Sequence, residues 1–258
     1  MSSRQRSIRT EGVILRRKNF GEKDRLLTIF TRKMGRVSVI AKGVRNPGSR
    51  KAGHVETFMR SSLLIARGRN LHILTQAETI DAYSSLRESL TGIGQGSYVV
   101  ELIDAFIYEE GINLPLYRLL IQTLERLDRG ADDDLILRYY ELRLLEQVGF
   151  RPELFQCVNC GSDIQAEDQF LSGALGGVVC PRCARPELGV SFRPIGVRAL
   201  KYLRHFQRST YADLEGLEVP SALRPGIEGA MRYFLTHMLE GKLNSPEFMD
   251  EISNSRRK

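Results

Sequence analysis

The chain has 258 residues, of which 42% are hydrophobic and 27% are charged. This length and composition allow about two or three domains with apolar cores and exclude a disordered protein. The formal net charge of +7 is unevenly distributed, because residues 1–51 hold 15 Lys or Arg and 3 Asp or Glu, a net charge of +12, which leaves −5 for the rest. Such a concentrated positive segment favours a polyanionic partner, either a nucleic acid or an anionic membrane surface.

The N-terminal residues MSSRQRSIRTEGVILRR contain only the short apolar run from Val13 to Leu15, which is too short for an export signal. No uninterrupted apolar run reaches the ~18 residues that span a bilayer. We therefore expect a soluble, cytoplasmic protein with no membrane partner.

Five short segments near the N-terminus alternate apolar and polar side chains or are rich in β-branched residues, which is typical of strands. They are residues 12–17, 25–31, 36–42, 61–66 and 71–77. Turn-forming residues separate them, as in Asn46-Pro47-Gly48. Five strands in about 80 residues predict a small barrel of the OB or SH3-like type.

The predicted strand RVSVIAK, residues 36–42, divides its side chains between two faces. Val37, Val39 and Ala41 can face a barrel core while the basic side chains face outward. We take eight basic residues from this strand, the loop after it and the end of the first strand as candidates for contact with the phosphates of a polyanion: Arg16, Arg17, Lys18, Arg36, Lys42, Arg45, Arg50 and Lys51. The alternative is a solvated sheet edge that charge protects from aggregation.

Base stacking has less support than phosphate contact. Phe20, Phe30 and Phe58 are the aromatic residues of this segment, and each of them is equally typical of a core residue.

From about Leu90 the apolar period is that of helices. Apolar stripes predict one helix over residues 99–107, closed by Gly111, and a second over 116–127, closed by Gly130. A third helix runs from the acidic residues 132–134 to Gly149. The acidic run is typical of a helix cap, and a metal or catalytic cluster is the alternative. Arg138 in the third helix is either a half-buried basic anchor or a side chain that extends to solvent.

Four cysteines form two C-x2-C pairs, Cys157 with Cys160 and Cys180 with Cys183, separated by 19 residues. In a reducing compartment this spacing is typical of one structural zinc ion (Zn2+) with four thiolate ligands. The glycine-containing segment between the pairs predicts short strands and turns that depend on the metal to fold. A redox C-x-x-C motif and a pair of cystines are the alternatives.

Two more helices are predicted after the cysteines. The first begins at Pro194 and has a basic face, which is either solvated or a second anionic contact: Arg198, Lys201, Arg204, His205 and Arg208. The second covers about 222–241, ends at Gly241 and precedes the tail SNSRRK, which we expect to be disordered.

The predicted fold class is α+β, with an N-terminal OB-fold β-barrel, an α-helical domain and an inserted four-cysteine zinc module. We predict the basic barrel over residues 1–82, the helical domain over 83–155 and the zinc module over 156–186. Residues 187–258 are expected to form C-terminal helices that rejoin the helical domain.

Several segments in this order resemble the bacterial RecO family of recombination mediators: GVILRRKNFGEKDRLLTIFT, GRVSVIAKGVR, LRYYELRLLEQVGF, CVNC with CPRC, and LEGKLNSPEF. The resemblance spans nearly the whole chain. Its most specific parts are the GRVSVIAKGVR strand and the LRxxExxLL helix that leads into the cysteines.

The resemblance implies a protein of DNA repair that is not an enzyme and lies in the cytoplasm with the nucleoid. RecO proteins bind single- and double-stranded DNA and anneal complementary strands. They act with RecR, sometimes with RecF, to load the RecA recombinase onto DNA coated by the single-strand-binding protein SSB. They also bind the acidic C-terminal tail of SSB through the helical domain, and Arg138 matches the arginine of the LRxxExxLL motif, which makes it the candidate contact for that tail.

Two other classes of function compete with this one. One is a nucleic-acid-modifying enzyme with a structural zinc, although the sequence lacks a P-loop, H-E-x-x-H, G-x-S-x-G and G-x-G-x-x-G motif. The other is a zinc-containing transcription or translation factor, which would show a strong sequence or RNA preference.

Overall fold

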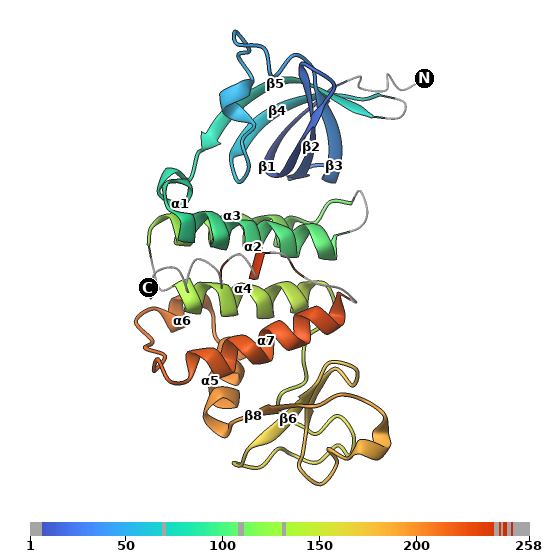
Figure 1. Cartoon of the computed structure of the whole chain (residues 1–258), viewed down its shortest axis with the longest axis vertical. Coiled ribbons are helices and arrows are strands. Elements are labelled where there is room, and N and C mark those ends of the chain that lie inside the picture. Colours follow the sequence, from blue (N-terminus) through green and yellow to red (C-terminus); the bar gives the residue numbers. More distant parts are fainter. Residues whose placement is uncertain are drawn as a thin grey trace. The chain divides into compact units, whose positions relative to one another are not determined.

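The computed structural model describes residues 7–68, 71–107, 111–130, 133–239, 243, 245–246 and 249, and Figure 1 shows its elements. The chain divides into two compact units, one made of Met1–Ala131 with Asn244–Lys258 and the other of Asp132–Leu243. The expected helix end at Gly241 and the SNSRRK tail lie outside the described residues. The finer division into four segments stays a prediction.

The first unit begins with a closed barrel of five strands, as predicted. They are β1 (Ser7–Phe20), β2 (Asp24–Thr31), β3 (Gly35–Ala41), β4 (Arg60–Ala66) and β5 (His72–Asp81). The strand order around the barrel is β1-β2-β3-β5-β4, and β4 pairs back with β1. Neighbouring strands are antiparallel except β3 and β5, which are parallel. This is the strand order of an OB-fold.

The interior of the barrel contains the apolar face that alternation predicted for β3. Val37, Val39 and Ala41 are buried and pack with apolar side chains of the other four strands. Ile40, which alternation assigns to the outer face, is buried as well. The inward face of this strand is therefore confirmed, and its outward face is partly covered.

Gly35 fixes the turn that leads into β3. Its φ of +70° lies in the left-handed region that favours glycine. A Cβ at this position would also lie 2.0 Å from the carbonyl oxygen of Gly111. The hydroxyl of Thr31 donates to the Gly35 carbonyl over 3.0 Å, so the turn and the register of the basic strand are set together.

Three helices complete the described part of the first unit: α1 (Ser84–Glu88), α2 (Leu90–Phe106) and α3 (Leu114–Asp128). The residues before α2 and α3 cap these helices. The Ser89 side chain accepts a hydrogen bond from the amide of Gly92, and the Asn113 side chain accepts one from the amide of Leu116. The apolar stripe predicted over residues 99–107 is buried as far as Phe106, where α2 ends, and Ile107 after it is half-buried. The α1 helix was not predicted, because five residues are too few to show a helical period.

The described part of the second unit contains four α-helices, α4 (Asp133–Gln147), α5 (Val197–Arg208), α6 (Tyr211–Leu214) and α7 (Arg224–Met238), of which α4, α5 and α7 pack on one another. It also holds a three-stranded sheet of β6 (Gln169–Ser172), β7 (Gly177–Val179) and β8 (Arg193–Ile195), in the order β7-β6-β8. Short 3-10 helices cover Ala52–His54 in the first unit and Pro186–Leu188 in the second.

The expectation that a helix begins at Pro194 is wrong. Pro194 lies in β8, which pairs with β6, and α5 begins at Val197. Because β8 is an edge strand, a residue without an amide hydrogen is tolerated there.

Candidate metal centre and nucleic-acid interface

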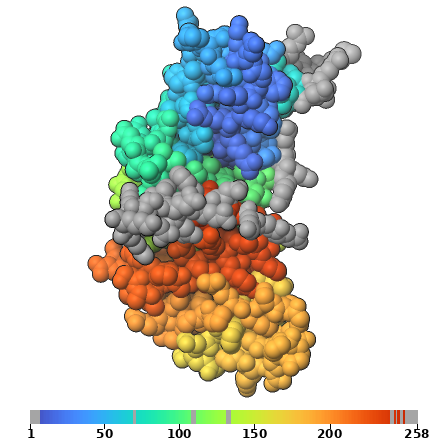
Figure 2. Space-filling model, viewed as in Figure 1, coloured from blue at the N-terminus to red at the C-terminus, as the bar shows by residue number. Residues whose placement is uncertain are grey.

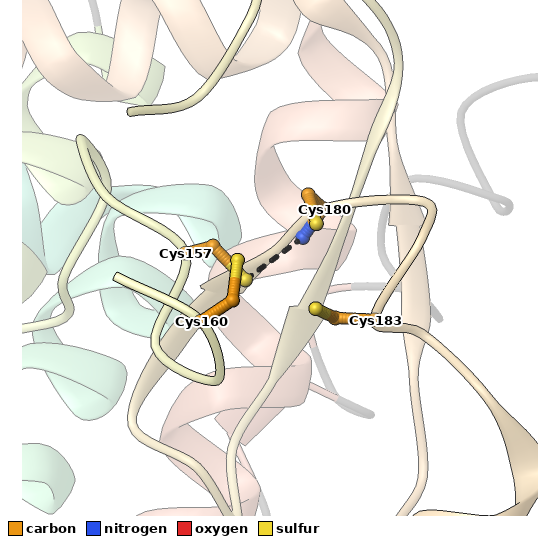
Figure 3. Close-up of side chains that lie close together, drawn as sticks. All are labelled: Cys157, Cys160, Cys180 and Cys183. Atoms are coloured by element: carbon orange, nitrogen blue, oxygen red, sulfur yellow. Dashed lines mark hydrogen bonds between the residues drawn. The ribbon is translucent and has the colours of Figure 1, made fainter. Parts of the chain in front are cut away.

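The four cysteines of the second unit converge from two loops, as Figure 3 shows. Their Sγ atoms all lie within 4.8 Å of one another, and all four cysteines are free of disulfides. Four sulfurs bound at ~2.3 Å in a tetrahedron lie about 3.8 Å apart. The donor set therefore fits one metal ion with a closed shell of four ligands.

Backbone hydrogen bonds shape both cysteine loops. The amide of Gly161, whose φ is +73°, donates to the carbonyl of Cys157 over 2.8 Å. The amide of Cys183 likewise donates to the carbonyl of Cys180 over 2.9 Å. The two loops are joined by the amide of Cys180, which lies 3.4 Å from the Sγ of Cys157. Such an amide stabilises a thiolate at the position where a metal would need one.

The surroundings of the sulfurs differ between the two members of each pair. Cys157 and Cys180 are buried and Cys160 is exposed. Hydrogen bonds from Ser162, first from its hydroxyl and then from its backbone amide, lower the pKa of Cys160 to about 6. A thiol that ionises near neutral pH is a ready metal ligand.

The apolar core around the cysteines is small. It consists of Cys157, Val179 and Cys180 with partly buried neighbours, among them Phe170 and Phe192, whose ring centroids are 6.4 Å apart. A core of this size cannot offset the conformational entropy of the loops, so a bound metal would contribute to folding.

The eight candidate DNA-binding residues, which we call the basic surface, all belong to the barrel strands and to the loop after β3, within the blue part of Figure 2. Three of them, Lys18, Lys42 and Arg50, are exposed, and within the described ranges their side chains form neither an ion pair nor a hydrogen bond. Exposed cations without a carboxylate partner are free to bind phosphate.

Arg16 and Arg36 share one buried carboxylate. The Nε of Arg16 lies 2.6 Å from one oxygen of Asp104, and the Nε of Arg36 lies 2.5 Å from the other. The Asp104 side chain is only 1% exposed, while that of Arg16 is 63% exposed. Arg36 therefore joins β3 to α2, and Arg16 retains guanidinium surface toward solvent.

Arg17 also has an internal partner, since it forms an ion pair with Glu56. Arg25 binds the other oxygen of this carboxylate at 3.0 Å. Sequence reasoning missed both Glu56 and Asp104, because a carboxylate tens of residues away in the chain gives no local signal.

The loop after β3, residues 42–51, is held in place by the barrel. Lys51 donates its Nζ to the carbonyls of Lys42 and Leu74, at 3.0 and 3.3 Å. The amide of Arg45 donates to the carbonyl of Lys23 over 2.9 Å, and its guanidinium donates to the carbonyl of Gly21 over 3.2 Å. Lys51 and Arg45 thus fix the loop that presents Lys42 and Arg50.

Arg138 lies in α4, and its side chain is more deeply buried than either sequence interpretation expected. It is 6% exposed, and its Nη2 lies 2.9 Å from an oxygen of the fully buried Glu141. Arg138 also lines a small pocket with apolar and charged neighbours: Asp134, Leu135, Phe206, Val219, Arg224, Ile227 and Glu228.

The acidic run before Arg138 is described only in part, since Asp132 lies outside the described residues. Asp134 binds Arg224 of α7 at 2.7 Å, so this carboxylate joins two helices. Within the described ranges, the four cysteines are the one group of side chains arranged to hold a metal.

The basic face predicted for the helix after the cysteines lies on α5. Arg198, Lys201, His205 and Arg208 are exposed, and Arg204 is half-buried. The guanidinium of Arg208 lies 3.7 Å from the centroid of the Phe155 ring, and that of Arg204 lies 5.2 Å from it. Burial, reinforced by the charge of Arg208, lowers the pKa of Arg204. Both the solvated and the anion-binding interpretation stay open for this face.

Together these features define an OB-fold protein with a basic surface and a four-thiol group able to hold one metal ion. The chain belongs to the RecO family of DNA repair and recombination proteins. The family description "Recombination protein O N terminal" matches residues 1–83, and "Recombination protein O C terminal" matches residues 87–247. The resemblance noted in the sequence is thereby confirmed.

Relatives named "DNA repair protein RecO" align with almost the full chain. The protein of Roseiflexus sp. (strain RS-1) is 40% identical over 251 residues, which cover 96% of this chain and 87% of the relative. That of Pelotomaculum thermopropionicum is 35% identical over 249 residues, covering 96% and 95%. That of Dehalococcoides mccartyi (strain ATCC BAA-2100) is 33% identical over 245 residues, covering 95% and 96%. In the part of the chain that the structure describes, no helix has the length and apolar character needed to cross a membrane.

Proposed function

We propose that this protein is a non-enzymatic recombination mediator of the cytoplasm and nucleoid. It binds single- and double-stranded DNA, anneals complementary strands and acts with RecR, and in some settings RecF, to load RecA onto SSB-coated DNA. The observation that carries the proposal is the group of exposed cations Lys18, Lys42 and Arg50 on the OB-type barrel, which lack ion-pair partners within the described residues.

The mechanism on the barrel is neutralisation of phosphates. Each cation that contacts a phosphate releases condensed counterions, and this contributes about 0.7 to the log–log salt dependence of binding to a single strand. Two strands whose phosphates are neutralised on one surface repel each other less, so complementary bases can pair. Lys18, Lys42, Arg50 and the exposed part of Arg16 are the groups we assign to this contact.

The other members of the basic surface have a positioning role in this proposal. Arg36 holds β3 to α2 through Asp104, and Lys51 and Arg45 hold the loop after β3 through backbone carbonyls. Their substitution should disturb the surface by changing its shape as well as its charge.

For the four cysteines we propose one structural Zn2+. A closed set of thiolates has no position for a substrate, and d10 zinc accepts tetrahedral sulfur ligands without a geometric preference of its own. The ion would hold the loops of Cys157 and Cys180 together, and the hydrogen bonds from Ser162 favour the thiolate of Cys160.

For the acidic C-terminal tail of SSB we propose the pocket lined by Arg138 and Arg224. Its two guanidinium groups suit carboxylates, and Leu135, Phe206 and Ile227 give it apolar walls. Asp134 and Glu228 line the same pocket, so binding there requires that the tail compete with internal ion pairs.

The decisive experiment is annealing of complementary oligonucleotides coated with the cognate SSB, followed by RecA loading with and without RecR. The wild-type chain should accelerate both steps. The Lys18→Ala, Lys42→Ala and Arg50→Ala triple variant should lose annealing while keeping its thermal midpoint. Equal annealing by the triple variant and the wild type would refute the assignment of the barrel surface.

A further inference from the structure

The one exposed aromatic ring among the described residues of the first unit is that of Phe20. It is 53% exposed, whereas Phe30 and Phe58, the other aromatic residues of the barrel segment, are 0% and 4% exposed. The described rings of the helices in this unit, those of Tyr83, Tyr98, Phe106 and Tyr117, are also buried. The structure therefore separates Phe20 from the core rings, which the sequence pattern could not do.

Phe20 occupies a fixed position at the tip of a hairpin. It is the last residue of β1 and pairs with Asp24, the first residue of β2, so three residues form the turn. Gly21 begins this turn with a φ of +58°. A ring at the end of a regular strand is presented in a defined direction, and little freedom is lost when a ligand binds to it.

The hairpin tip is tied to the basic loop after β3. Arg45 donates to the carbonyls of Gly21 and Lys23, and the amide of Gly43 donates to the carboxylate of Asp24 over 2.7 Å. These contacts bind both sides of the turn to the loop that carries Lys42 and Arg50. The turn beside Phe20 and the loop that carries Lys42 and Arg50 are thus joined by hydrogen bonds.

Lys18 adds a cation on the same strand as the ring. The register of β1 with β2 is regular from Arg16 to Phe20, so Lys18 and Phe20, two positions apart, point to the same face of the strand. Their Cα atoms are separated by about 7 Å, which is close to the spacing of successive phosphates in an extended strand. The combination of a cationic track and an aromatic platform is the general design of single-strand binding surfaces.

We propose that Phe20 is a base-stacking subsite, on which an unstacked base of single-stranded nucleic acid lies while Lys18 and the loop after β3 hold its phosphates. This inference deepens the proposed function and rests on it. A base is available for stacking only when it is unpaired, so the subsite gives the barrel a preference for single strands over duplex. Stacking on a ring tolerates any base, because every base has a π-face.

The test compares two fluorescent probes with the full-length protein. One is an oligothymidylate of about 16 nucleotides, within the site size of an OB-fold, and the other has the same length and phosphates with abasic residues in place of the bases. Phe20→Ala should weaken binding of the oligothymidylate by about tenfold and leave binding of the abasic probe unchanged. Phe20→Tyr should bind both probes as the wild type does, and Phe20→Leu should behave as Phe20→Ala.

Salt titration separates this subsite from the phosphate contacts. Phe20→Ala should lower affinity without changing the log–log salt slope, whereas Lys42→Ala should reduce the slope. Equal affinity of Phe20→Ala and the wild type for the oligothymidylate, or an equal loss on both probes, would overturn the stacking subsite and leave the phosphate surface standing. Binding of neither probe by the wild type would overturn both. The thermal midpoint of each variant verifies that folding is intact.

Discussion

Arg36 of β3 donates its Nε to the buried carboxylate of Asp104 on α2 at 2.5 Å, across 68 positions of sequence. The strand that precedes the basic loop 42–51 is therefore anchored through its own arginine. Arg16 binds the second oxygen of the same carboxylate. One acidic side chain thus binds two of the eight candidate DNA-binding residues.

Replacing Asp104 with Asn should destabilise the first unit. The amide cannot compensate two guanidinium groups, and the loss is expected to be about 1–3 kcal/mol in the free energy of unfolding. Urea unfolding followed by circular dichroism measures it. Glu88→Gln, at an exposed acidic position of α1, is the matched control and should stay within about 0.5 kcal/mol of the wild type. Equal stability of both variants would show that the shared carboxylate contributes nothing.

Arg50→Ala should affect DNA affinity without affecting stability. The lost phosphate contact should lower the log–log salt slope on single-stranded DNA by about 0.7, as measured by fluorescence anisotropy between low and moderate salt. Arg118→Ala removes an equally exposed charge from α3 and serves as the control with an unchanged slope. An effect of the same size in both variants would point to net charge instead of a local contact.

Metal removal should unfold the four-cysteine module and leave the barrel intact. We expect one zinc ion per chain by mass spectrometry of metals, and four thiols that react with a thiol reagent only after chelation. Cys157→Ser, at a buried ligand position, should lower the metal content and abolish the chelator-sensitive transition. Binding of single-stranded DNA by the barrel should persist in this variant. Four reactive thiols in the purified protein before chelation would contradict the closed metal site.

Arg138→Ala should do two things at once. It should weaken binding of a labelled acidic SSB-tail peptide, and it should cost about 3–5 kcal/mol of stability, because the fully buried Glu141 would lose the guanidinium that lies 2.9 Å from it.

The Arg138→Met/Glu141→Leu double variant separates these effects. Replacing both members of a buried ion pair by apolar residues of similar volume is often neutral for stability, so the double variant should be as stable as the wild type and still bind the peptide poorly. A stable double variant with full peptide affinity would exclude Arg138 as the tail contact.

The ion pair of Glu11 with Arg60 should make the stability of the barrel depend on pH in the acidic range. The hydrogen bond from Arg60, with help from Arg32, lowers the pKa of Glu11 below its ordinary value of 4.5. Since the folded-state pKa is below the unfolded one, the stabilisation is complete above about pH 4.5 and is lost as the pH falls through the lowered pKa. The difference in unfolding free energy between the wild type and Glu11→Gln should therefore vanish in strong acid. A difference in unfolding free energy that does not change with pH would show that the charge of Glu11 does not stabilise the barrel.

Much of the fold follows from local periodicity. Alternation in residues 36–42 is enough to place Val37 and Val39 in the core, because successive side chains of a strand point to opposite faces. The helical period of the apolar residues likewise predicts which side chains of α2 are buried. The prediction that a helix begins at Pro194 was wrong, because proline is compatible both with the first turn of a helix and with an edge strand. Only the pairing of β8 with β6 distinguishes the two.

The five strands of the barrel, the helical periods and the group of four cysteines able to hold a metal can be predicted from the sequence, because each of these depends on residues a few positions apart or on a fixed ligand spacing. Which cations are exposed and available to bind phosphate depends on the tertiary structure. Arg36 has a carboxylate partner from α2, Arg138 is buried beside Glu141, and Lys42 and Arg50 stay exposed. It also decided that Phe20 is the exposed ring of the barrel segment and Phe30 a core ring. These outcomes depend on contacts between residues far apart in the chain, and such contacts give no signal in the local sequence pattern.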